Sequence, residues 1–443
     1  MTDQTAVLDK IFTAHSVGAH VVKVTTGPTT VLYSVELRDG VRPEEVLRLA
    51  ETIKMRTAAT SVRILSPVPG ESVMGIELPR ADRQTVLLKD VPLDGGHPLT
   101  VPLGIDTAGH PQTRNLATMP HWIVAGATGS GKSVYINDVI VSLINRCGPE
   151  VMRLVLVDPK EVELAAYADV PHLACPIVTD PDDAVDTLQW LCDEMDRRYS
   201  LLRAHKVREL TAYNRAVSDA LTLPYLVVIV DELADLMARA RKEIEPLIVR
   251  LAGKARAAGI HMVLATQRPS VDVVTGLIKD NVPSRLAFAV PSHTASGVIL
   301  NRSGAQHLLG QGDALYMAQD VGDPLRVQTP YTSDEDIEAA VLAAQERYPD
   351  TAYLWPQEED AEEVSQLPVW LPPQSDVPCE RPAARAMQVL RQVAEDPQTV
   401  TLSHGWIAAL VMFWVVIGLA FLIVVIGQHT QPESNSTVVV ATP

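Results

Sequence analysis

The sequence predicts an α/β protein, in which a parallel sheet with helices on both faces follows a small α+β domain. A Gly-rich loop joins an apolar strand to a helix within residues 121–133. Apolar runs then alternate with helical stretches through residue 340, which is the pattern that a parallel sheet requires. Before residue 118, short β-rich runs are separated by turn signals and by one helix, as in an α+β domain.

The first predicted domain covers residues 1–118. Its helix is expected at Pro43–Lys54, between the second and third strands. The expected strands are Val21–Thr26, Thr30–Leu37, Ser61–Pro67, Val73–Leu78 and Gln84–Leu88. A hairpin-like stretch at Leu99–Gln112 separates this domain from the sheet that follows.

The second predicted domain, residues 119–340, contains the parallel sheet. Its expected strands are Trp122–Ala125, Met152–Asp158, Tyr225–Glu232, His261–Thr266 and Arg285–Val290. Helical stretches at Asp182–Ala204 and Glu243–Ala257 lie between them. This alternation is typical of a doubly wound, RecA-like core.

An acidic, Pro-rich linker is expected at residues 341–403, with one helix at Arg381–Glu395. The chain has a net charge of −17, and residues 341–443 hold 4 Lys and Arg against 12 Asp and Glu. The first 340 residues hold 33 against 42 and are only mildly acidic. A nucleic-acid partner is therefore not excluded, because DNA affinity depends on the charge that faces the phosphates.

An uncharged, apolar run of 22 residues lies near the end of the chain, at Trp406–Gly427. This length predicts a transmembrane helix at 404–428 in the lipid bilayer and a short polar tail at 429–443. The alternative is a buried core helix, which would be unusually long and apolar on every face. Arg381, Arg385 and Arg391 precede the run and no Lys or Arg follows it. The positive-inside rule therefore predicts a single-pass membrane anchor with the large domain in the cytoplasm.

The loop GATGSGKS fits the phosphate-binding pattern in full. Glycines let backbone N–H groups surround phosphates at a helix N-terminus, Lys132 is expected to contact the β- and γ-phosphates, and the Ser133 hydroxyl to bind Mg²⁺. The predicted nucleotide-binding residues are Gly126, Ala127, Thr128, Gly129, Ser130, Gly131, Lys132, Ser133 and Val134. A chance Gly/Ser turn is the alternative. The flanking strand and helix supply the context that the motif requires, so we expect ATP and Mg²⁺ as ligands.

Two polar groups follow later strands at the same predicted edge. Asp231 and Glu232 end the run YLVVIVDE; in P-loop ATPases this aspartate holds Mg²⁺ and the glutamate polarises the attacking water. A surface ion pair and a cap for the next helix are the alternatives. Gln267 ends the following strand, where it can sense the γ-phosphate. Alternatively, it satisfies backbone groups in the turn before Pro269.

These motifs resemble the FtsK/SpoIIIE family of DNA translocases between about Val21 and Val341. The runs that carry the resemblance are PHWIVAGATGSGKSV, LVLVDPKEVEL, DEMDRRY, LPYLVVIVDELADLM, LAGKARAAGIHMVLATQRPSVDVVTGLIKDNVPSRLAF and LLGQGDALY. TGPT at Thr26–Thr29 and GIELPR at Gly75–Arg80 resemble the family's α domain. The resemblance implies an ATPase that forms a homo-oligomeric, hexameric ring and moves double-stranded DNA through its centre.

The resemblance also implies roles for residues outside the nucleotide motifs. Arg256 matches the arginine that such motors present to the nucleotide of the adjacent subunit, where it stabilises charge on the transferring phosphoryl group. Arg268 and Lys279 match loops that contact DNA phosphates, and solvated loop cations are the alternative reading of both. Ser292 and His293 begin a DNA-contacting loop in which the family has SKxDSR and this chain has SHTASG. Part of the DNA contact is therefore expected to be weakened or moved, with Arg302 as one new position.

Two further departures concern the ends of the chain. The acidic linker takes the place of the family's winged-helix module, and a single C-terminal apolar helix replaces several N-terminal membrane helices. We therefore expect a membrane-tethered ATPase that moves double-stranded DNA. One alternative is a coupling or secretion ATPase that moves protein or single-stranded DNA. The other is a membrane-bound DNA-binding scaffold with an impaired motor.

Overall fold

The computed structural model describes residues 3–68, 70–93, 96–119, 121–318, 322–349 and 351–354. Most of the expected linker, its helix at 381–395, the expected membrane helix at Trp406–Gly427 and the tail at 429–443 lie outside the described residues. Within the ranges given above, no helix combines the length and apolar character needed to cross a bilayer.

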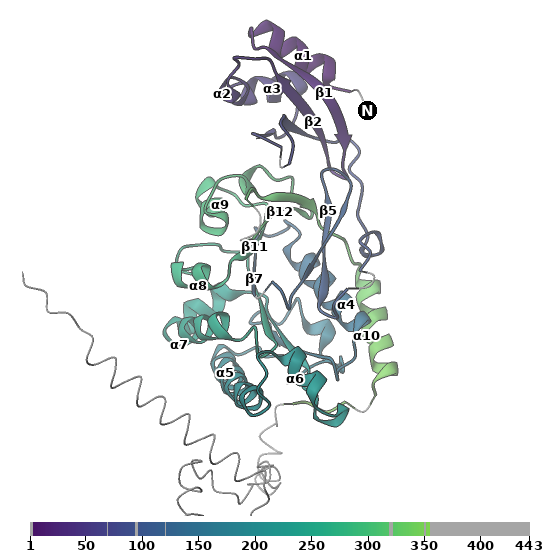
Figure 1. Cartoon of the computed structure of the whole chain (residues 1–443), viewed down its shortest axis with the longest axis vertical. Helices are drawn as coiled ribbons and strands as arrows, with labels where there is room; N and C mark the ends of the chain where they lie inside the picture. The colour runs from purple at the N-terminus through teal and green to yellow at the C-terminus, as the bar shows by residue number, and fades with distance from the viewer. Residues whose placement is uncertain are drawn as a thin grey trace, which may run out of the picture. The chain divides into compact units, whose positions relative to one another are not determined.

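The N-terminal module, residues 3–80, packs three helices against a four-stranded antiparallel sheet (Figure 1). Its elements are α1 (Thr5–Ala14), β1 (Ala19–Thr26), β2 (Thr30–Leu37), α2 (Pro43–Leu47), α3 (Ala50–Thr57), β3 (Arg63–Leu65) and β4 (Met74–Pro79). The strands lie in the order β1-β2-β4-β3. Phe12 of α1, Ile53 of α3 and Ile76 of β4 are fully buried and form part of its own apolar core.

The helices of this module differ from the prediction. The stretch expected as one helix at Pro43–Lys54 is divided into α2 and α3. Helix α1 has no counterpart among the predicted elements. Its buried residues Leu8, Ile11 and Phe12 have the i, i+3, i+4 spacing of an amphipathic helix, which is the signal that identifies it.

The predicted strand at Gln84–Leu88 is wrong. Its backbone groups bond singly to two separate parts of the chain: Gln84 N donates to Pro28 O (3.0 Å), and Val86 O accepts from Tyr331 N (2.8 Å). These two isolated bonds do not make a β-ladder, since a ladder needs successive residue pairs with one neighbouring strand. The segment instead leads into the 3₁₀ helix η1 (Leu88–Asp90).

A nine-stranded sheet forms the centre of the large domain, residues 96–349. In chain order its strands are β5 (Thr100–Asp106), β6 (Pro111–Asn115), β7 (His121–Ala125), β8 (Met152–Val157), β9 (Tyr225–Val230), β10 (Ile260–Thr266), β11 (Ser284–Phe288), β12 (Asp313–Met317) and β13 (Leu325–Gln328). The spatial order is β6-β5-β13-β12-β11-β7-β10-β9-β8. The five predicted strands, β7 to β11, pair in parallel as expected.

The sheet is mixed and not wholly parallel, which corrects the prediction. Four strands extend it in antiparallel fashion beyond β11. The expected hairpin at Leu99–Gln112 supplies two of them, because β5 pairs with β13. Leu99 and Leu103 are fully buried in the same core cluster as Trp122 of β7. The chain therefore enters the nine-stranded sheet at β5, before the domain boundary that the sequence predicts at residue 118.

Helices cover both faces of this sheet, as predicted (Figure 1). They are α4 (Lys132–Arg146), α5 (Pro181–Ala204), α6 (Leu210–Ala216), α7 (Leu233–Lys254), α8 (Gly276–Asn281), α9 (His293–Leu300) and α10 (Asp334–Arg347), with short 3₁₀ helices η2 (Ala165–Tyr167), η3 (Asp219–Leu221) and η4 (Ala305–His307). The core of one face includes α5, α7 and α8, and that of the other includes α4, α6 and α10. Helix α10 continues past residue 340, where the linker is expected to begin, because Val341 and Ala344 are buried in the second core.

Candidate nucleotide site

The phosphate-binding loop, Gly126–Gly131, leaves β7 at the edge where the parallel strands end. Two backbone hydrogen bonds anchor its start to the last residue of β10 and to the residue after β11. Gly126 N donates to Thr266 O (3.2 Å), and Ala127 N donates to Ala289 O (2.9 Å). Because carboxyl ends of parallel strands share one edge, the residues that end β9 and β10 lie beside this loop.

Two glycines of the loop adopt a backbone conformation that other residues rarely take. Gly129 has φ = 74° and Gly131 has φ = 111°. A Cβ atom on Gly131 would lie 2.5 Å from the backbone N of Gly312, which is too close for any side chain. Glycine at 131 is therefore required both by the left-handed turn and by the close approach of a second loop.

Lys132 and Asp231 form a buried ion pair at the start of α4. Lys132 Nζ lies 2.5 Å from Asp231 Oδ1 and donates to Asp231 O at 2.9 Å. The side chains are 2% and 0% exposed. Burial raises the pKa of the Asp231 carboxyl, and the Lys132 ammonium opposes that rise. Asp231 Oδ2 is buried with no hydrogen-bond partner among the described residues, so a carboxylate oxygen remains available for a further ligand.

Ser133 and Asp231 offer the kind of oxygen atoms that Mg²⁺ prefers. Ser133 Oγ donates to Glu163 Oε1 at 2.9 Å, so a second carboxylate stands beside the predicted metal position. Hydroxyl and carboxylate oxygens, together with the unpartnered Asp231 Oδ2, fit a hard divalent cation. The residues present are therefore compatible with Mg²⁺.

At the junction of β9 and α7, Glu232 accepts hydrogen bonds from three donors that lie outside α7. Thr266 Oγ1 donates to Oε1 (2.6 Å), Lys160 Nζ donates to Oε2 (2.9 Å), and Gln267 N lies 3.1 Å from Oε1. Burial alone would raise the pKa of Glu232, but these hydrogen bonds and the Lys160 charge hold it below its ordinary value. Glu232 also caps α7 through Ala234 N, so the predicted base and the alternative cap are the same residue.

Gln267 connects the predicted base to the phosphate-binding loop. Its side-chain Oε1 accepts from Thr128 Oγ1 at 2.7 Å, while its backbone N donates to Glu232. A residue that contacts the loop through its side chain and Glu232 through its backbone is positioned to respond to a change in either. This geometry supports the sensor role predicted for Gln267.

The loop that follows β8 contributes two site residues for which the sequence motifs predict no role, Lys160 and Glu163. Asp158 shapes this loop, because its carboxylate accepts from the backbone N of Lys160 (3.2 Å), Val162 (3.0 Å) and Leu164 (3.0 Å). The available signal is positional: a charged run, DPKEVEL, directly follows a buried parallel strand at the edge where the phosphate-binding loop lies.

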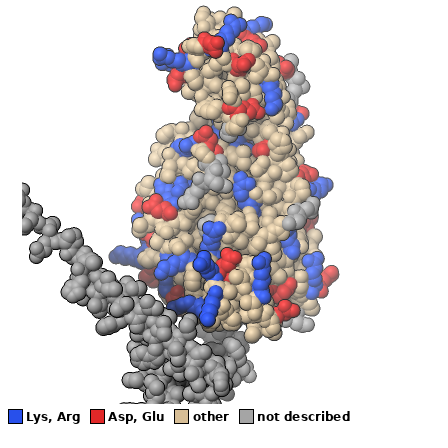
Figure 2. Space-filling model, in the orientation of Figure 1, with Lys and Arg blue, Asp and Glu red and all other residues tan. Residues whose placement is uncertain are grey.

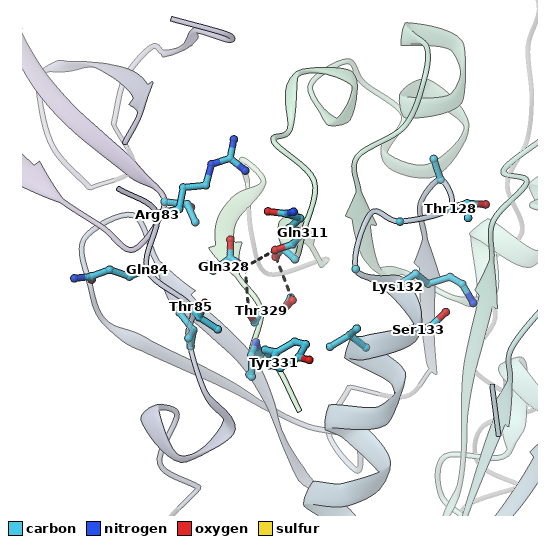
Figure 3. Close-up of a pocket in the computed structure, with 18 of the residues that line it drawn as sticks. Arg83, Gln84, Thr85, Thr128, Lys132, Ser133, Gln311, Gln328, Thr329 and Tyr331 are labelled. Atoms are coloured by element: carbon cyan, nitrogen blue, oxygen red, sulfur yellow. Dashed lines mark hydrogen bonds between the residues drawn. The ribbon is translucent and has the colours of Figure 1, made fainter. Parts of the chain in front are cut away.

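The phosphate-binding loop forms one wall of a cavity of about 600 Å³ (Figure 3). This volume lies within the range of about 300–1,000 Å³ that is usual for small-molecule sites. The opposite wall consists of polar and aromatic residues, namely Arg83, Gln84, Thr85, Gln328, Thr329 and Tyr331. None of these was predicted, because they come from the segment after the N-terminal module and from the end of β13, which carry no motif.

Arg256 lies away from the phosphate-binding loop of its own chain. It follows α7 and precedes β10, so it stands at the amino edge of the parallel strands, whereas the loop leaves their carboxyl edge. The side chain is exposed, and its Nε donates to Ala117 O at 3.3 Å. Such a placement agrees with a contribution to another subunit and rules out contact with the chain's own Lys132.

Other basic side chains accompany Arg256 at this edge. In Figure 2, Lys and Arg gather over the part of the molecule where Figure 1 places α5, α6 and α7. Arg208, Lys254 and Arg256 line another cavity of about 530 Å³, together with one acidic residue, Glu209. The local charge around Arg256 is therefore positive, which suits an anionic partner.

The four predicted DNA-contacting residues lie after β10, on α8 and at the start of α9. Arg268 is 75% exposed and follows β10, with Nη1 3.9 Å from Asp235 Oδ1. Lys279 on α8 donates to Asn301 Oδ1 at 3.2 Å, beside the end of α9. Ser292 and His293 are exposed at the start of α9, where Ser292 Oγ accepts from Ala295 N and so acts as the helix cap. Arg302, the predicted substitute, is 2.7 Å from Asp323.

Two family models match the chain. The FtsK alpha domain matches residues 1–80, and the FtsK/SpoIIIE family model matches residues 93–271. The DNA translocase FtsK of Mycobacterium tuberculosis (strain ATCC 25618 / H37Rv) is 48% identical over 363 residues, and that of Tropheryma whipplei (strain TW08/27) is 50% identical over 342 residues. The alignments cover 78% and 74% of this chain, but 44% and 46% of the relatives. The chain thus matches less than half the length of these relatives.

Two solved structures with a similar fold are a conjugation coupling protein and a secretion ATPase. The pCW3 conjugation coupling protein TcpA, determined with ATPγS, has a TM-score of 0.55 and 23% identity, over 77% of this chain and 99% of that chain. The cytoplasmic domain of the Thermomonospora curvata type VII secretion ATPase EccC has a TM-score of 0.51 and 23% identity, over 60% and 33%. These likenesses confirm the predicted RecA-like fold and carry no information about cargo.

Proposed function

We propose, from the FtsK/SpoIIIE family domain and the FtsK alpha domain that this chain carries, that it is an ATPase that moves double-stranded DNA. One observation carries the proposal: the phosphate-binding loop lies at the same edge of the sheet as four side chains of the nucleotide site. These are Lys132, Asp231, Glu232 and Gln267. Relatives that are 48% and 50% identical to this chain are named DNA translocases, which supports DNA as the molecule that is moved.

The site residues divide the work of binding and hydrolysis. MgATP, when bound, supplies the phosphoryl group and a cation that neutralises its charge. Backbone N–H groups of the loop and Lys132 would hold the phosphates, and oxygens of Ser133 and Asp231 would hold the metal. Glu232, which stays ionised at neutral pH, accepts a hydrogen bond from the attacking water. Gln267 passes a change at the loop to Glu232 through its two hydrogen bonds.

The proposal includes a ring in which Arg256 completes the site of an adjacent subunit. Its exposure, its position at the amino edge and the positive charge around it support this role. A head-to-tail contact of this kind generates a ring when the rotation between subunits closes, and the family resemblance makes a hexamer the expected size.

Arg268, Lys279 and the start of α9 are proposed as the DNA-contacting surface. Arg268, Ser292 and His293 are exposed, which supports this assignment, whereas Lys279 is half-buried and the Ser292 hydroxyl already caps α9. Contacts from cations to phosphates are independent of sequence. Arg268→Ala and Lys279→Ala should each reduce the salt dependence of duplex binding, by about one unit in log–log slope.

The decisive experiment measures ATP hydrolysis by the full chain with no DNA, with a duplex and with single strands of equal length. We expect the duplex to stimulate ATP hydrolysis more than the single strands do. The Lys132→Ala substitution should abolish hydrolysis under all three conditions. Lys10→Ala, which changes an exposed lysine on α1, is the matched control and should behave as the parent. Stimulation by single strands alone, or turnover that survives Lys132→Ala, would contradict the proposal.

A further inference from the structure

A buried cluster of charges joins the N-terminal module to the large domain. At its centre is Arg326 of β13, which is 4% exposed. Its Nη1 donates to Glu77 Oε2 of β4 at 2.7 Å, and its Nη2 and Nε donate to Asp313 Oδ2 and Oδ1 of β12 at 2.7 and 2.9 Å. One guanidinium therefore bridges carboxylates from two parts of the chain that lie far apart in sequence.

Glu77 has a second arginine partner. Arg63 Nη1 of β3 donates to Glu77 Oε1 at 3.2 Å, and Arg63 Nη2 donates to Pro324 O of the large domain at 3.0 Å. Glu77 is 1% exposed. Burial alone would raise its pKa, but Arg63 and Arg326 hold the pKa of Glu77 below its ordinary value. The cluster thus contains two cations and two carboxylates, and loss of Glu77 or Arg326 would leave a buried charge with fewer partners.

The cluster continues from Asp313 to the phosphate-binding loop. Asp313 Oδ2 also accepts from Leu309 N at 2.8 Å, which closes the turn at residues 309–313. Within this turn, Gly312 N donates to Ser130 O at 2.9 Å, and Gly312 O accepts from Thr329 N at 2.8 Å. The same turn lies so close to the phosphate-binding loop that Gly131 has no room for a side chain.

A second hydrogen bond ties this turn to β13. Gln328 Nε2 donates to Gln311 O at 2.8 Å, and Figure 3 shows this contact across the cavity from Lys132. Gln328 lies two residues after Arg326 on the same strand. The orientation of the strand and that of the turn therefore depend on each other, and the turn contacts the loop that holds the phosphates.

We propose that Glu77, Arg326 and Asp313 are positioning residues through which the N-terminal module sets the geometry of the phosphate-binding loop. The proposal rests on the nucleotide-binding part of the proposed function and is independent of the DNA partner. Loss of the Glu77 charge leaves Arg326 with one carboxylate, which loosens the link from β13 through the 309–313 turn to Ser130. Affinity for the triphosphate falls, although Glu77 does not touch the cavity.

The test compares two glutamates that hold buried arginines. Glu77→Gln removes a charge from the cluster. Glu194→Gln is the matched control, because Glu194 Oε1 accepts from the buried Arg198 at 2.7 Å on α5, away from the phosphate-binding loop. Binding of a fluorescent ATP analogue to the full chain is measured without DNA, and thermal unfolding is followed for each variant. Both variants should lower Tm, but only Glu77→Gln should raise Kd, by about tenfold.

Glu77→Asp keeps the charge, and it should restore most of the lost affinity and remain informative where Glu77→Gln does not fold. Unchanged Kd in folded Glu77→Gln, or an equal rise in Glu194→Gln, would overturn the positioning role and assign the cluster to stability alone. A parent protein that binds no nucleotide would contradict the proposed function as well, so the two failures are distinguishable.

Discussion

Glu232 shows how three local contacts prepare one side chain for chemistry. Both carboxylate oxygens receive hydrogen bonds, from Thr266, from the Gln267 backbone and from Lys160. These donors keep its pKa low and its orientation constant, which matches a group that polarises water rather than one that donates a proton. The ionised form is the competent form, so protonation of Glu232 itself should begin only below the ordinary glutamate range.

Glu232→Gln should separate binding from hydrolysis. The amide keeps an acceptor for Thr266 but cannot polarise water, so the hydrolysis rate should fall by about 10²–10⁴-fold while nucleotide affinity is retained. Steady-state hydrolysis and analogue binding measure the two effects. Asp235→Asn, which changes a more exposed carboxylate 3.9 Å from Lys160, is the control and should retain activity. A Glu232→Gln protein that hydrolyses ATP normally would show that another group activates the water.

Helix α4 carries the phosphate-binding Lys132 at one end and a buried carboxyl, Asp138, on its core side. Asp138 Oδ1 accepts from Thr332 Oγ1 at 2.6 Å, in the segment just before α10, and Oδ2 has no partner in the described part of the chain. Burial raises the pKa of Asp138 to about 8. The contact between α4 and α10 therefore includes a group that prefers to be protonated.

Stability should depend on pH through Asp138. The folded state holds this proton up to about pH 8, whereas the unfolded chain loses it near the ordinary value of 3.8. The stabilising contribution of the Asp138 proton is therefore complete below the unfolded-state pKa of 3.8. It is lost as pH rises through the folded-state pKa of about 8. Between these limits the free energy of unfolding should fall by about 1.4 kcal/mol per pH unit relative to Asp138→Asn. Urea unfolding from pH 5 to 8 measures this, with exposed Asp186→Asn as the control; parallel curves for parent and Asp138→Asn would contradict it.

In the proposed ring, Arg256 completes the site of an adjacent subunit, because it lies at the opposite sheet edge from Lys132 of its own chain. Arg256→Ala and Lys132→Ala should each be inactive alone, because an arginine of this kind contributes at least about 10³-fold to hydrolysis. When the two variants are mixed and allowed to exchange subunits, about a quarter of the interfaces should contain an intact Lys132 and an intact Arg256. Hydrolysis by the mixture measures this recovery. No recovery, despite verified subunit exchange, would place Arg256 outside the neighbour's site.

The proposed membrane anchor is a property of the whole chain. An uncharged run of the length of Trp406–Gly427 should hold the protein in the bilayer, since about 20 apolar residues suffice to cross it. Deletion of residues 404–443 should move the protein from the membrane fraction to the supernatant and leave ATP hydrolysis intact. Membrane flotation measures the first effect. A deleted protein that still floats with membranes would disprove the anchor.

Local patterns were sufficient to predict much of this protein. The phosphate-binding loop, Asp231 and Glu232 were identified because each follows an apolar strand, and parallel strands bring their carboxyl ends together. The five parallel strands and the helical stretches at Asp182–Ala204 and Glu243–Ala257 were also predicted, since side-chain periodicity reflects burial. Helix α1 carried such a pattern too, with Leu8, Ile11 and Phe12 on one face.

Only the tertiary structure decided how distant segments complete the site. The antiparallel addition of β12, β13, β5 and β6 depends on long-range pairing, which no local period encodes. Glu163 and the Glu77–Arg326–Asp313 cluster depend on ion pairs and hydrogen bonds between residues that are distant in sequence. From sequence alone a charged residue is expected at the surface, because a charged side chain is buried only when an opposite charge pairs with it. The partner is known only from the tertiary structure.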